Sequence, residues 1–328
     1  MITISVCMIV KNEEKHLARC LDSLQGLWDE LIIVDTGSTD STKEIAARYT
    51  DRIYDHPWRD DFAHARNYAF SLAGCDHIYA PDADEVLDAE NRRKFARLKQ
   101  ALLPEVEIVQ MIYVNRHAHK TTENFEKDYR PKLFKRLRTF QWIDPVHETI
   151  RLQPIIYDSD IEILHMPSES HAGRDLRIFR SVIRKGHPLS ARLHNMYARE
   201  LFMAGAAKDL LEAEDFFKES LRDGARSQDE HMEALCVLAR AARVKKDHAE
   251  LLSLCLNGIA AGPCAELCME AGDYYREIGD WENARDWYEN ARSTPAILDI
   301  RCQEEFPKER LALCDAANAN DRSGAVHV

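Results

Sequence analysis

The chain has 328 residues, and its 44 lysines and arginines against 56 aspartates and glutamates give a formal net charge of −12. The length predicts about two domains that each bury a core, and the acidic balance argues against non-specific binding to a nucleic-acid backbone, which requires a basic face. No stretch approaches the ~18 consecutive apolar residues that a membrane span needs.

The first half of the chain alternates short apolar runs with helical patterns. Buried strands are predicted over 4–10, 31–34, 52–54 and 77–80, and further strands over 107–114, 130–138 and 153–165. Helices are predicted from Asn12, which is a good N-cap, from Lys43, and over 60–69. The repeated strand–helix–strand order predicts an α/β fold with a largely parallel sheet.

Two of the predicted strands end in carboxylates. One leads into the sequence Pro-Asp-Ala-Asp-Glu at 81–85, and an earlier one ends in Asp35. Open α/β sheets bind ligands at the carboxyl ends of their strands, and two carboxylates around one small residue can share a divalent cation that holds a diphosphate. The pattern predicts a nucleotide-diphosphate site, with Asp35 at the base or ribose and Asp82 and Asp84 at the metal. The alternatives are solvated loop carboxylates and a turn-forming aspartate.

Strand signals end at about residue 168, and long helical patterns follow. Three helix–turn–helix units align on Asp209, Asp247 and Asp280, which are 38 and 33 residues apart. This spacing is close to the ~34-residue period of tetratricopeptide repeats. We therefore expect an α/β domain over 1–167, a linker or helix over 168–190, an all-α tetratricopeptide-like domain over 191–317 and a disordered tail over 318–328.

The nine cysteines are scattered, and their odd number suits reduced, buried thiols in a cytoplasmic protein. Cys264 and Cys268 lie one helical turn apart, but no second pair completes a zinc site in the sequence. The thiols are therefore expected to be structural.

Four motifs in the first half resemble family 2 glycosyltransferases, and the resemblance covers about residues 1–165. They are Val-Lys-Asn-Glu-Glu at 10–14, Val-Asp-Thr-Gly-Ser-Thr-Asp at 34–40, Asp-Phe-Ala-His-Ala-Arg-Asn at 61–67 and Asp-Ala-Asp-Glu at 82–85. The chain is most similar to the branch that includes lipopolysaccharide-core glucosyltransferases and the sublancin S-glycosyltransferase, whose members often carry trailing helical repeats. The resemblance implies a GT-A fold and inverting transfer from a nucleotide sugar with Mn²⁺ or Mg²⁺.

The resemblance also implies roles for single residues. Asp35 would contact the uridine part of the donor, Asp84 would ligate the metal, and Asp82 would assist through the metal shell or the donor sugar. Arg66 would approach the donor phosphates or the uracil. The remaining donor-site positions implied by the motifs are Val10, Asn12, Glu13, Gly37 and Ala83. Family members usually have an apolar residue directly before the Asp-x-Asp motif, whereas this chain has Pro81. Proline removes a backbone hydrogen-bond donor at the end of the strand.

A further element, Trp-Ile-Asp-Pro-Val-His-Glu at 142–148, resembles the Val-His-Glu element near the end of the same catalytic domain. An inverting transfer needs a base on the acceptor side, for which Glu148 is the first candidate and Asp144 and His147 are the alternatives. His147 or His165 could instead supply a late metal ligand. In the simpler interpretation, His147 and Glu148 only hold the loop backbone.

The stretch 130–138 is basic, with aromatic residues interleaved. It could contact the diphosphate or an anionic acceptor, or it could be a solvated strand face.

The sequence therefore predicts a cytoplasmic, metal-dependent inverting hexosyltransferase that uses UDP-glucose or a similar donor. The helical repeats are expected to select the acceptor, since stacked helix pairs form concave surfaces, and they could also mediate homo-oligomers. A peptide or protein, a lipid-linked or core saccharide and a modified nucleic-acid base are the open acceptor classes. The alternative is a repeat-based binding or scaffold protein whose GT-A domain only binds nucleotide or is inactive.

Overall fold

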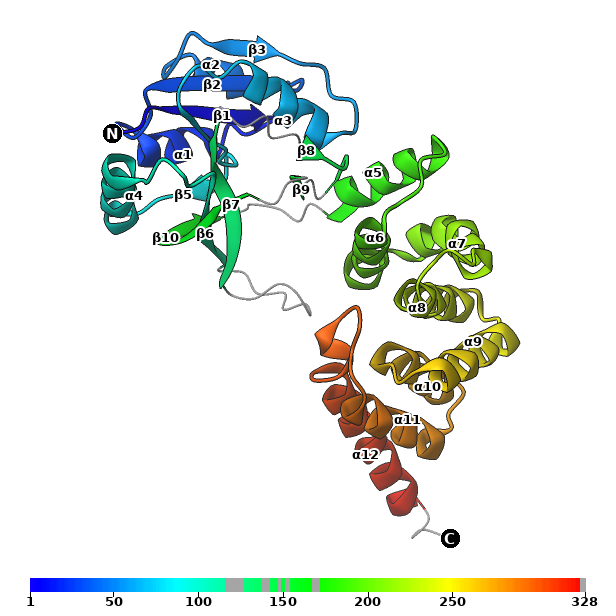
Figure 1. Cartoon of the computed structure of the whole chain (residues 1–328). Helices are drawn as coiled ribbons and strands as arrows, with labels where there is room; N and C mark the ends of the chain where they lie inside the picture. Colours follow the sequence, from blue (N-terminus) through cyan, green and yellow to red (C-terminus); the bar gives the residue numbers. More distant parts are fainter. Residues whose placement is uncertain (116–126, 137–141, 147–148, 151–153, 167–171, 325–328) are drawn as a thin grey trace. The chain divides into compact units, whose positions relative to one another are not determined.

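The computed structural model describes residues 1–115, 127–136, 142–146, 149–150, 154–166 and 172–324 (Figure 1). The described residues divide into two compact units, one ending at Met166 and one beginning at Ala172. The first is an α/β unit and the second is entirely helical. This confirms the predicted fold class, whereas the exact domain boundaries at 167 and 191 stay predictions.

A mixed sheet forms the centre of the α/β unit. Among the described residues it has eight strands in the order β3-β2-β1-β4-β7-β6-β10-β5. They are β1 (Ile4–Val10), β2 (Glu30–Asp35), β3 (Ile53–Asp55), β4 (His77–Tyr79), β5 (Glu85–Val86), β6 (Ile108–Asn115), β7 (Lys127–Lys135) and β10 (Ile156–His165). The strands β3, β2, β1 and β4 run parallel, as predicted, and β7 is antiparallel to both β4 and β6. The strands β8 (Trp142–Ile143) and β9 (Thr149–Ile150) pair separately.

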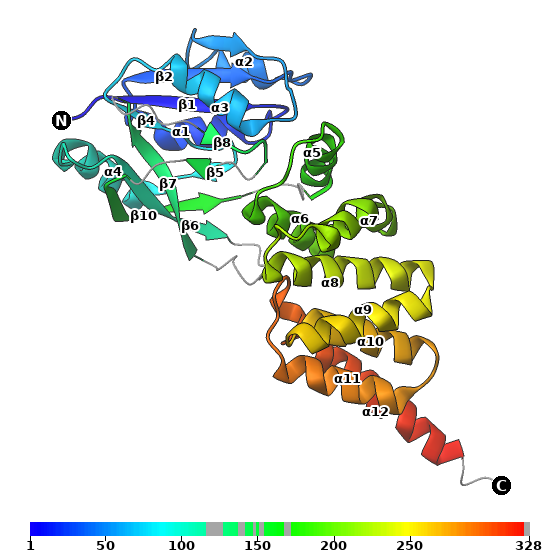
Figure 2. The same cartoon turned by 45° about the vertical axis from the view of Figure 1, so that its right-hand side comes forward.

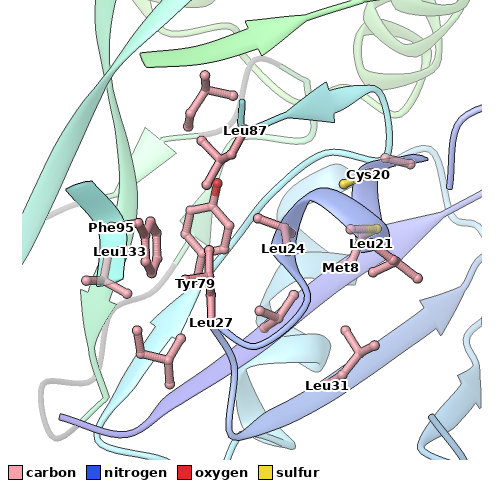
Figure 3. Close-up of a cluster of buried hydrophobic side chains, with 14 of the residues drawn as sticks. Met8, Cys20, Leu21, Leu24, Leu27, Leu31, Tyr79, Leu87, Phe95 and Leu133 are labelled. Carbon is pink, nitrogen blue, oxygen red and sulfur yellow. The ribbon is translucent and has the colours of Figure 1, made fainter. Parts of the chain in front are cut away.

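Helices cover both faces of the sheet, which is why its central strands are continuous apolar runs. On one face, α1 (Leu17–Leu24) and α4 (Ala89–Ala101) pack on alternate residues of β1 and on Tyr79 of β4. Figure 3 shows Tyr79 lying between Leu24 and Phe95, and the Tyr79 and Phe95 rings meet edge to face at 5.0 Å. On the other face, Cys7 and Ile78 pack with α3 (Phe62–Ser71). The short helix α2 (Thr42–Ala46) follows β2. This packing fixes the strand ends that carry the carboxylates.

The predicted start of the first helix is wrong. Helix α1 begins at Leu17, and Asn12 has a left-handed backbone with φ 56°. Instead of capping its own helix, Asn12 accepts the Thr39 N–H at 2.8 Å through Oδ1, and its N–H donates to Ser38 Oγ at 2.9 Å. A polar side chain beside a turn can hydrogen-bond the backbone N–H groups of its own helix or those of a neighbouring loop. Here the Asn12 side chain bonds the loop after β2.

The helical unit contains helices paired across the predicted turns (Figure 2). Its helices are α5 (Ala172–Arg184), α6 (Ala191–Ala204), α7 (Ala207–Arg222), α8 (Gln228–Lys245), α9 (His248–Ala261), α10 (Ala265–Glu277), α11 (Trp281–Ser293) and α12 (Phe306–Gly324), with the short 3₁₀ helix η1 (Ile300–Cys302). Asp247 and Asp280 are N-caps of α9 and α11. The close approach of α10 and α11 requires Gly272, because a Cβ there would lie 2.6 Å from the Tyr288 ring. The C-terminus differs from the prediction, since α12 continues to Gly324 within the segment expected to be disordered.

A buried polar group joins α6, α7 and α8. The ring of His194 lies 2.6 Å from Glu233 Oε2 through Nδ1 and 3.1 Å from Ser220 Oγ through Nε2. A serine, a histidine and a glutamate bonded in this order resemble the catalytic triad of a hydrolase. His194 is fully buried, however, and the side chains of Ser220 and Glu233 are nearly so. With no access for a substrate, the group serves packing, because buried polar atoms must be hydrogen-bonded.

The raised pKa of Glu200 on α6 makes the stability of the helical unit depend on pH. Burial, reinforced by Asp175, raises the pKa of Glu200 from 4.5 to about 7. The folded chain thus keeps the proton to a higher pH than the unfolded chain, so stability is lost as pH rises between these two values. We expect Glu200→Gln to raise the Tm at pH 8 and to leave it nearly unchanged at pH 5, as measured by thermal melts. The exposed Glu219→Gln is the control, and a lower Tm of Glu200→Gln at pH 8 would contradict the argument.

Candidate active site

The predicted site residues gather at the carboxyl ends of three neighbouring parallel strands. Strand β1 lies between β2 and β4, and Val10 at its end is the register partner of Asp35 at the end of β2. Asp82 and Asp84 follow β4 at the same edge. This is the edge at which an open α/β sheet binds ligands.

Asp35 is buried, and only one of its carboxylate oxygens is satisfied. Its Oδ2 accepts the N–H groups of Gly37 and Ser38, each at 3.0 Å. Its Oδ1 is buried without a hydrogen-bond partner among the described residues. Gly37 has φ 105°, a conformation that glycine adopts without a Cβ clash, and this lets the turn fold back onto the carboxylate. An unsatisfied buried carboxylate oxygen is costly, which marks it as an acceptor for a ligand donor.

The loops after β1 and β2 are held together by side chains. Besides the Asn12 contacts, the Glu13 N–H donates to Thr42 Oγ1 at 2.7 Å, and the Thr36 hydroxyl donates to the Val10 carbonyl at 3.1 Å. Asn12 and Glu13 thus shape the edge around Asp35 through loop contacts.

Asp82 is held between two cations. Its Oδ1 accepts from Arg66 Nη2 of α3 at 2.7 Å, and its Oδ2 lies 3.5 Å from Lys132 Nζ of β7. Burial raises the pKa of Asp82, but Lys132 and Arg66 outweigh this and hold the pKa well below its usual range. The Arg66 guanidinium in turn lies over the Trp142 ring, 5.1 Å from its centroid. Asp82 is therefore ionised and fixed in position.

Glu85 and Lys132 form a buried ion pair that the sequence did not indicate. Lys132 Nζ donates to Glu85 Oε1 at 2.5 Å, and both residues are almost completely buried. Burial raises the pKa of Glu85, and Lys132 opposes that change. Lys132 is therefore not on a solvated strand face, which is one of the two interpretations of the stretch 130–138.

Asp84 meets a histidine from the far end of the unit. Its Oδ2 lies 3.0 Å from His165 Nε2, and their side chains are 13% and 20% exposed. The antiparallel pairing of β10 with β5 brings them together, since His165 is the register partner of Glu85. The His165 ring also packs on Tyr113, with centroids 4.9 Å apart. A carboxylate and an imidazole at this separation, both partly accessible, are a suitable pair of ligands for a divalent transition metal.

Pro81 is accommodated because β4 ends before it. Ala80 makes the last hydrogen bond to β7, from its N–H to the Lys132 carbonyl at 2.9 Å. Pro81 follows where no further donor is needed. Ala83 is buried and packs into the core beneath the acidic residues.

The acceptor-side candidates are only partly described. Asp144 follows β8, is half-buried, and has a left-handed backbone with φ 71°. Both ends of the Asn67 amide bond the Trp142 backbone, at 2.9 and 2.7 Å, which fixes the segment before Asp144. Glu148 and His147 lie outside the described residues. Within the described ranges, no helix combines the length and apolarity that crossing a bilayer requires.

Comparisons with known proteins show what the α/β unit is similar to. Residues 5–158 match the model of Glycosyl transferase family 2. The glycosyltransferase SunS of Bacillus subtilis (strain 168) is 26% identical over 269 residues, which cover 76% of this chain and 61% of that protein. A TPR repeat-containing protein of Synechococcus elongatus is 46% identical over 90 residues, covering 27% of this chain and 22% of that protein.

Glucosyl-3-phosphoglycerate synthase from Mycobacterium tuberculosis, solved with Mn²⁺ and UDP-glucose, aligns with a TM-score of 0.43 and 19% identity over 58% of this chain and 82% of that one. The chain thus spans less than two thirds of the length of the two curated relatives. The family match covers the strand ends that carry Asp35, Asp82 and Asp84. The N-terminal unit of this chain is therefore similar to Glycosyl transferase family 2 over residues 5–158.

Proposed function

We propose that the chain is a metal-dependent inverting glycosyltransferase that moves a hexose from UDP-glucose or a similar UDP-sugar to an acceptor selected by the helical repeats. One observation carries the proposal. A buried carboxylate oxygen of Asp35, to which no described residue donates, lies at the same sheet edge as the Asp84–His165 pair. The Asp35 oxygen can accept a hydrogen bond from a nucleobase. The Asp84–His165 pair can bind a metal ion that holds the diphosphate.

The unsatisfied oxygen of Asp35 favours uracil as the base. The imide N–H of uracil can donate to Asp35 Oδ1, whereas cytosine has no hydrogen at the corresponding ring nitrogen. A hydrogen bond to a charged acceptor contributes about 1.5–3 kcal/mol, so this contact discriminates between the two bases by roughly 10- to 100-fold.

Asp84 and His165 are the residues that we assign to the metal. Asp82, predicted as a second ligand, has both oxygens next to Arg66 and Lys132, and we assign it mainly to orienting these cations. Mg²⁺ prefers ligand sets made only of oxygen, so the imidazole favours Mn²⁺. A divalent cation bound there would neutralise negative charge on the departing diphosphate.

In the proposed reaction, the acceptor attacks the anomeric carbon on the face opposite the diphosphate. The bond from that carbon to the diphosphate oxygen breaks, the pair of electrons leaves with UDP, and the acceptor proton passes to a carboxylate or imidazole. Asp144, Glu148 and His147 stay the candidates for that base. Arg66, held by Asp82, would supply positive charge to the donor phosphates.

The helical unit supplies the acceptor surface in this proposal, and a peptide or protein, a lipid-linked or core saccharide, or a modified base is the acceptor. The stacking of helix pairs supports this part of the proposal, because it forms surfaces suited to extended ligands. We also propose a cytoplasmic location, supported by the nine cysteines, which all lie in described segments and are free. Self-association through the repeats stays a prediction.

Replacing Asp35 with asparagine tests the donor assignment. An amide keeps one oxygen for the Gly37 and Ser38 N–H groups but places an NH₂ where the free oxygen lies, so it meets the uracil N–H donor to donor. We expect the Kd for UDP with Mn²⁺, measured by calorimetry, to rise about 10- to 100-fold. The exposed Asp51→Asn is the matched control. An unchanged Kd would remove the basis for uridine recognition, and a wild type that binds no UDP at all would favour a scaffold.

A further inference from the structure

Three potential metal ligands meet in the interior of the helical unit. They are Cys236 of α8, Cys264 at the N-terminus of α10 and Glu266 in its first turn. All three residues have an exposed fraction of 0%. Their ligand atoms all lie within 4.8 Å of one another, and the two Sγ atoms are 3.3 Å apart. Cys264 and Glu266 are two residues apart, whereas Cys236 lies 28 residues before Cys264, so the packing of α8 against the start of α10 assembles the cluster.

The Glu266 carboxylate is oriented by backbone groups so that one oxygen faces the thiols. Its Oε1 accepts the N–H groups of Ile297, Leu298 and Asp299 at 3.0, 2.7 and 2.9 Å. Its Oε2 accepts a hydrogen bond from the Cys264 thiol at 3.3 Å. The Ile297 N–H also donates to Oε2 at 3.2 Å, which is longer than its 3.0 Å contact with Oε1. Metal-binding carboxylates are usually held in this way, with outer hydrogen bonds on one oxygen and the ligand bond on the other.

The dimensions of the cluster suit a thiophilic ion. Zinc binds thiolate at ~2.3 Å and carboxylate at about 2.0–2.2 Å, so tetrahedral ligand atoms lie roughly 3.4–3.8 Å apart. The sulfur–sulfur separation of 3.3 Å needs only a small opening to reach that range. Thiolates are poor ligands for Mg²⁺ and Mn²⁺, so this cluster differs in preference from the Asp84–His165 pair.

A disulfide between the two cysteines fits the surroundings less well. Oxidation would remove the thiol hydrogen that Cys264 donates to Glu266 Oε2, leaving a buried carboxylate oxygen with less compensation. A cation at the same place would compensate both the thiolates and the carboxylate. Cys302 of η1 is also buried and follows the 297–299 segment whose N–H groups hold Glu266.

We propose that Cys236, Cys264 and Glu266 form a structural Zn²⁺ site in the helical unit, separate from the donor-binding edge. As the ion binds, the two thiols lose their protons to solvent and two Zn–S bonds form. The ion joins α8, the start of α10 and the 297–299 segment that precedes η1. It therefore stabilises the packing of the last helices and takes no part in sugar transfer.

The decisive experiment uses the full chain. Protein produced with added zinc is analysed for metal content, and the zinc is then exchanged for Co²⁺, whose thiolate complexes absorb strongly in the near ultraviolet. We expect one zinc per chain and an intense thiolate-to-cobalt band. Cys236→Ser and Cys264→Ser should each reduce the bound zinc to below about one tenth per chain. Cys314→Ser, which replaces a buried cysteine of α12, is the matched control and should keep the full amount.

The wild-type spectrum decides the question even if a variant fails to fold. Wild-type protein without stoichiometric zinc and without the cobalt band would overturn the proposal. So would an intact mass lower by two hydrogens with Cys236 and Cys264 joined in a peptide digest. UDP affinity with Mn²⁺ should be the same with and without bound zinc, which separates this site from the proposed donor site.

Discussion

Replacing Asp84 with asparagine is expected to lower kcat/KM for sugar transfer by about 1,000-fold, which corresponds to roughly 4 kcal/mol of lost transition-state stabilisation. The amide keeps the size of the side chain and its contact with His165, which lies 3.0 Å from Oδ2, but removes the negative charge that holds a divalent cation. Initial rates of transfer and of donor hydrolysis, measured across a series of Mn²⁺ concentrations, should show a much higher metal requirement.

The matched control for this variant is Asp160→Asn. Asp160 is an exposed carboxylate on β10, the strand that also carries His165, and it pairs with Lys94. Its replacement should leave the rates within about twofold, because exposed ion pairs contribute about 0–1 kcal/mol. Full activity of Asp84→Asn at low Mn²⁺, or an equal loss in both variants, would show that Asp84 is not the metal ligand.

Replacing Lys132 with methionine is expected to lower the free energy of unfolding by about 3–5 kcal/mol. Methionine fills similar volume but leaves Glu85, which is 2% exposed, without its cation in the core beneath the site. It also removes one of the two cations next to Asp82. Denaturant unfolding of the protein without donor measures the loss directly.

Two further variants identify the cause of that loss. Lys135→Met removes another lysine of β7 whose Nζ donates to the exposed Pro104 carbonyl, so its effect should stay below about 1 kcal/mol. The double variant Lys132→Met with Glu85→Gln should be more stable than Lys132→Met alone, because the uncompensated buried charge is gone. A single variant as stable as the wild type would mean that the pair contributes no net stability.

The sequence by itself determined the elements whose signals are local. Continuous apolar runs predicted β1, β2 and β4, since strands covered on both faces are apolar on both. The carboxylates after two of these runs predicted that Asp35, Asp82 and Asp84 share one edge of the sheet, because parallel strands bring their carboxyl ends together. In the second half, the spacing of turn residues such as Asp247 and Asp280 placed the helix pairs, and these aspartates do cap α9 and α11.

Only the tertiary structure decided which distant side chains meet. Lys132 lies 47 residues from Glu85, and nothing local distinguishes it from the solvated lysines nearby. His165 was one of two histidines considered for the metal, and the pairing of β10 with β5 brings it to Asp84 across 81 residues. Cys264 seemed matched to Cys268, one turn away, yet helix packing puts its sulfur against Cys236. Such contacts depend on the register and packing of elements far apart in the chain, which short-range patterns do not specify.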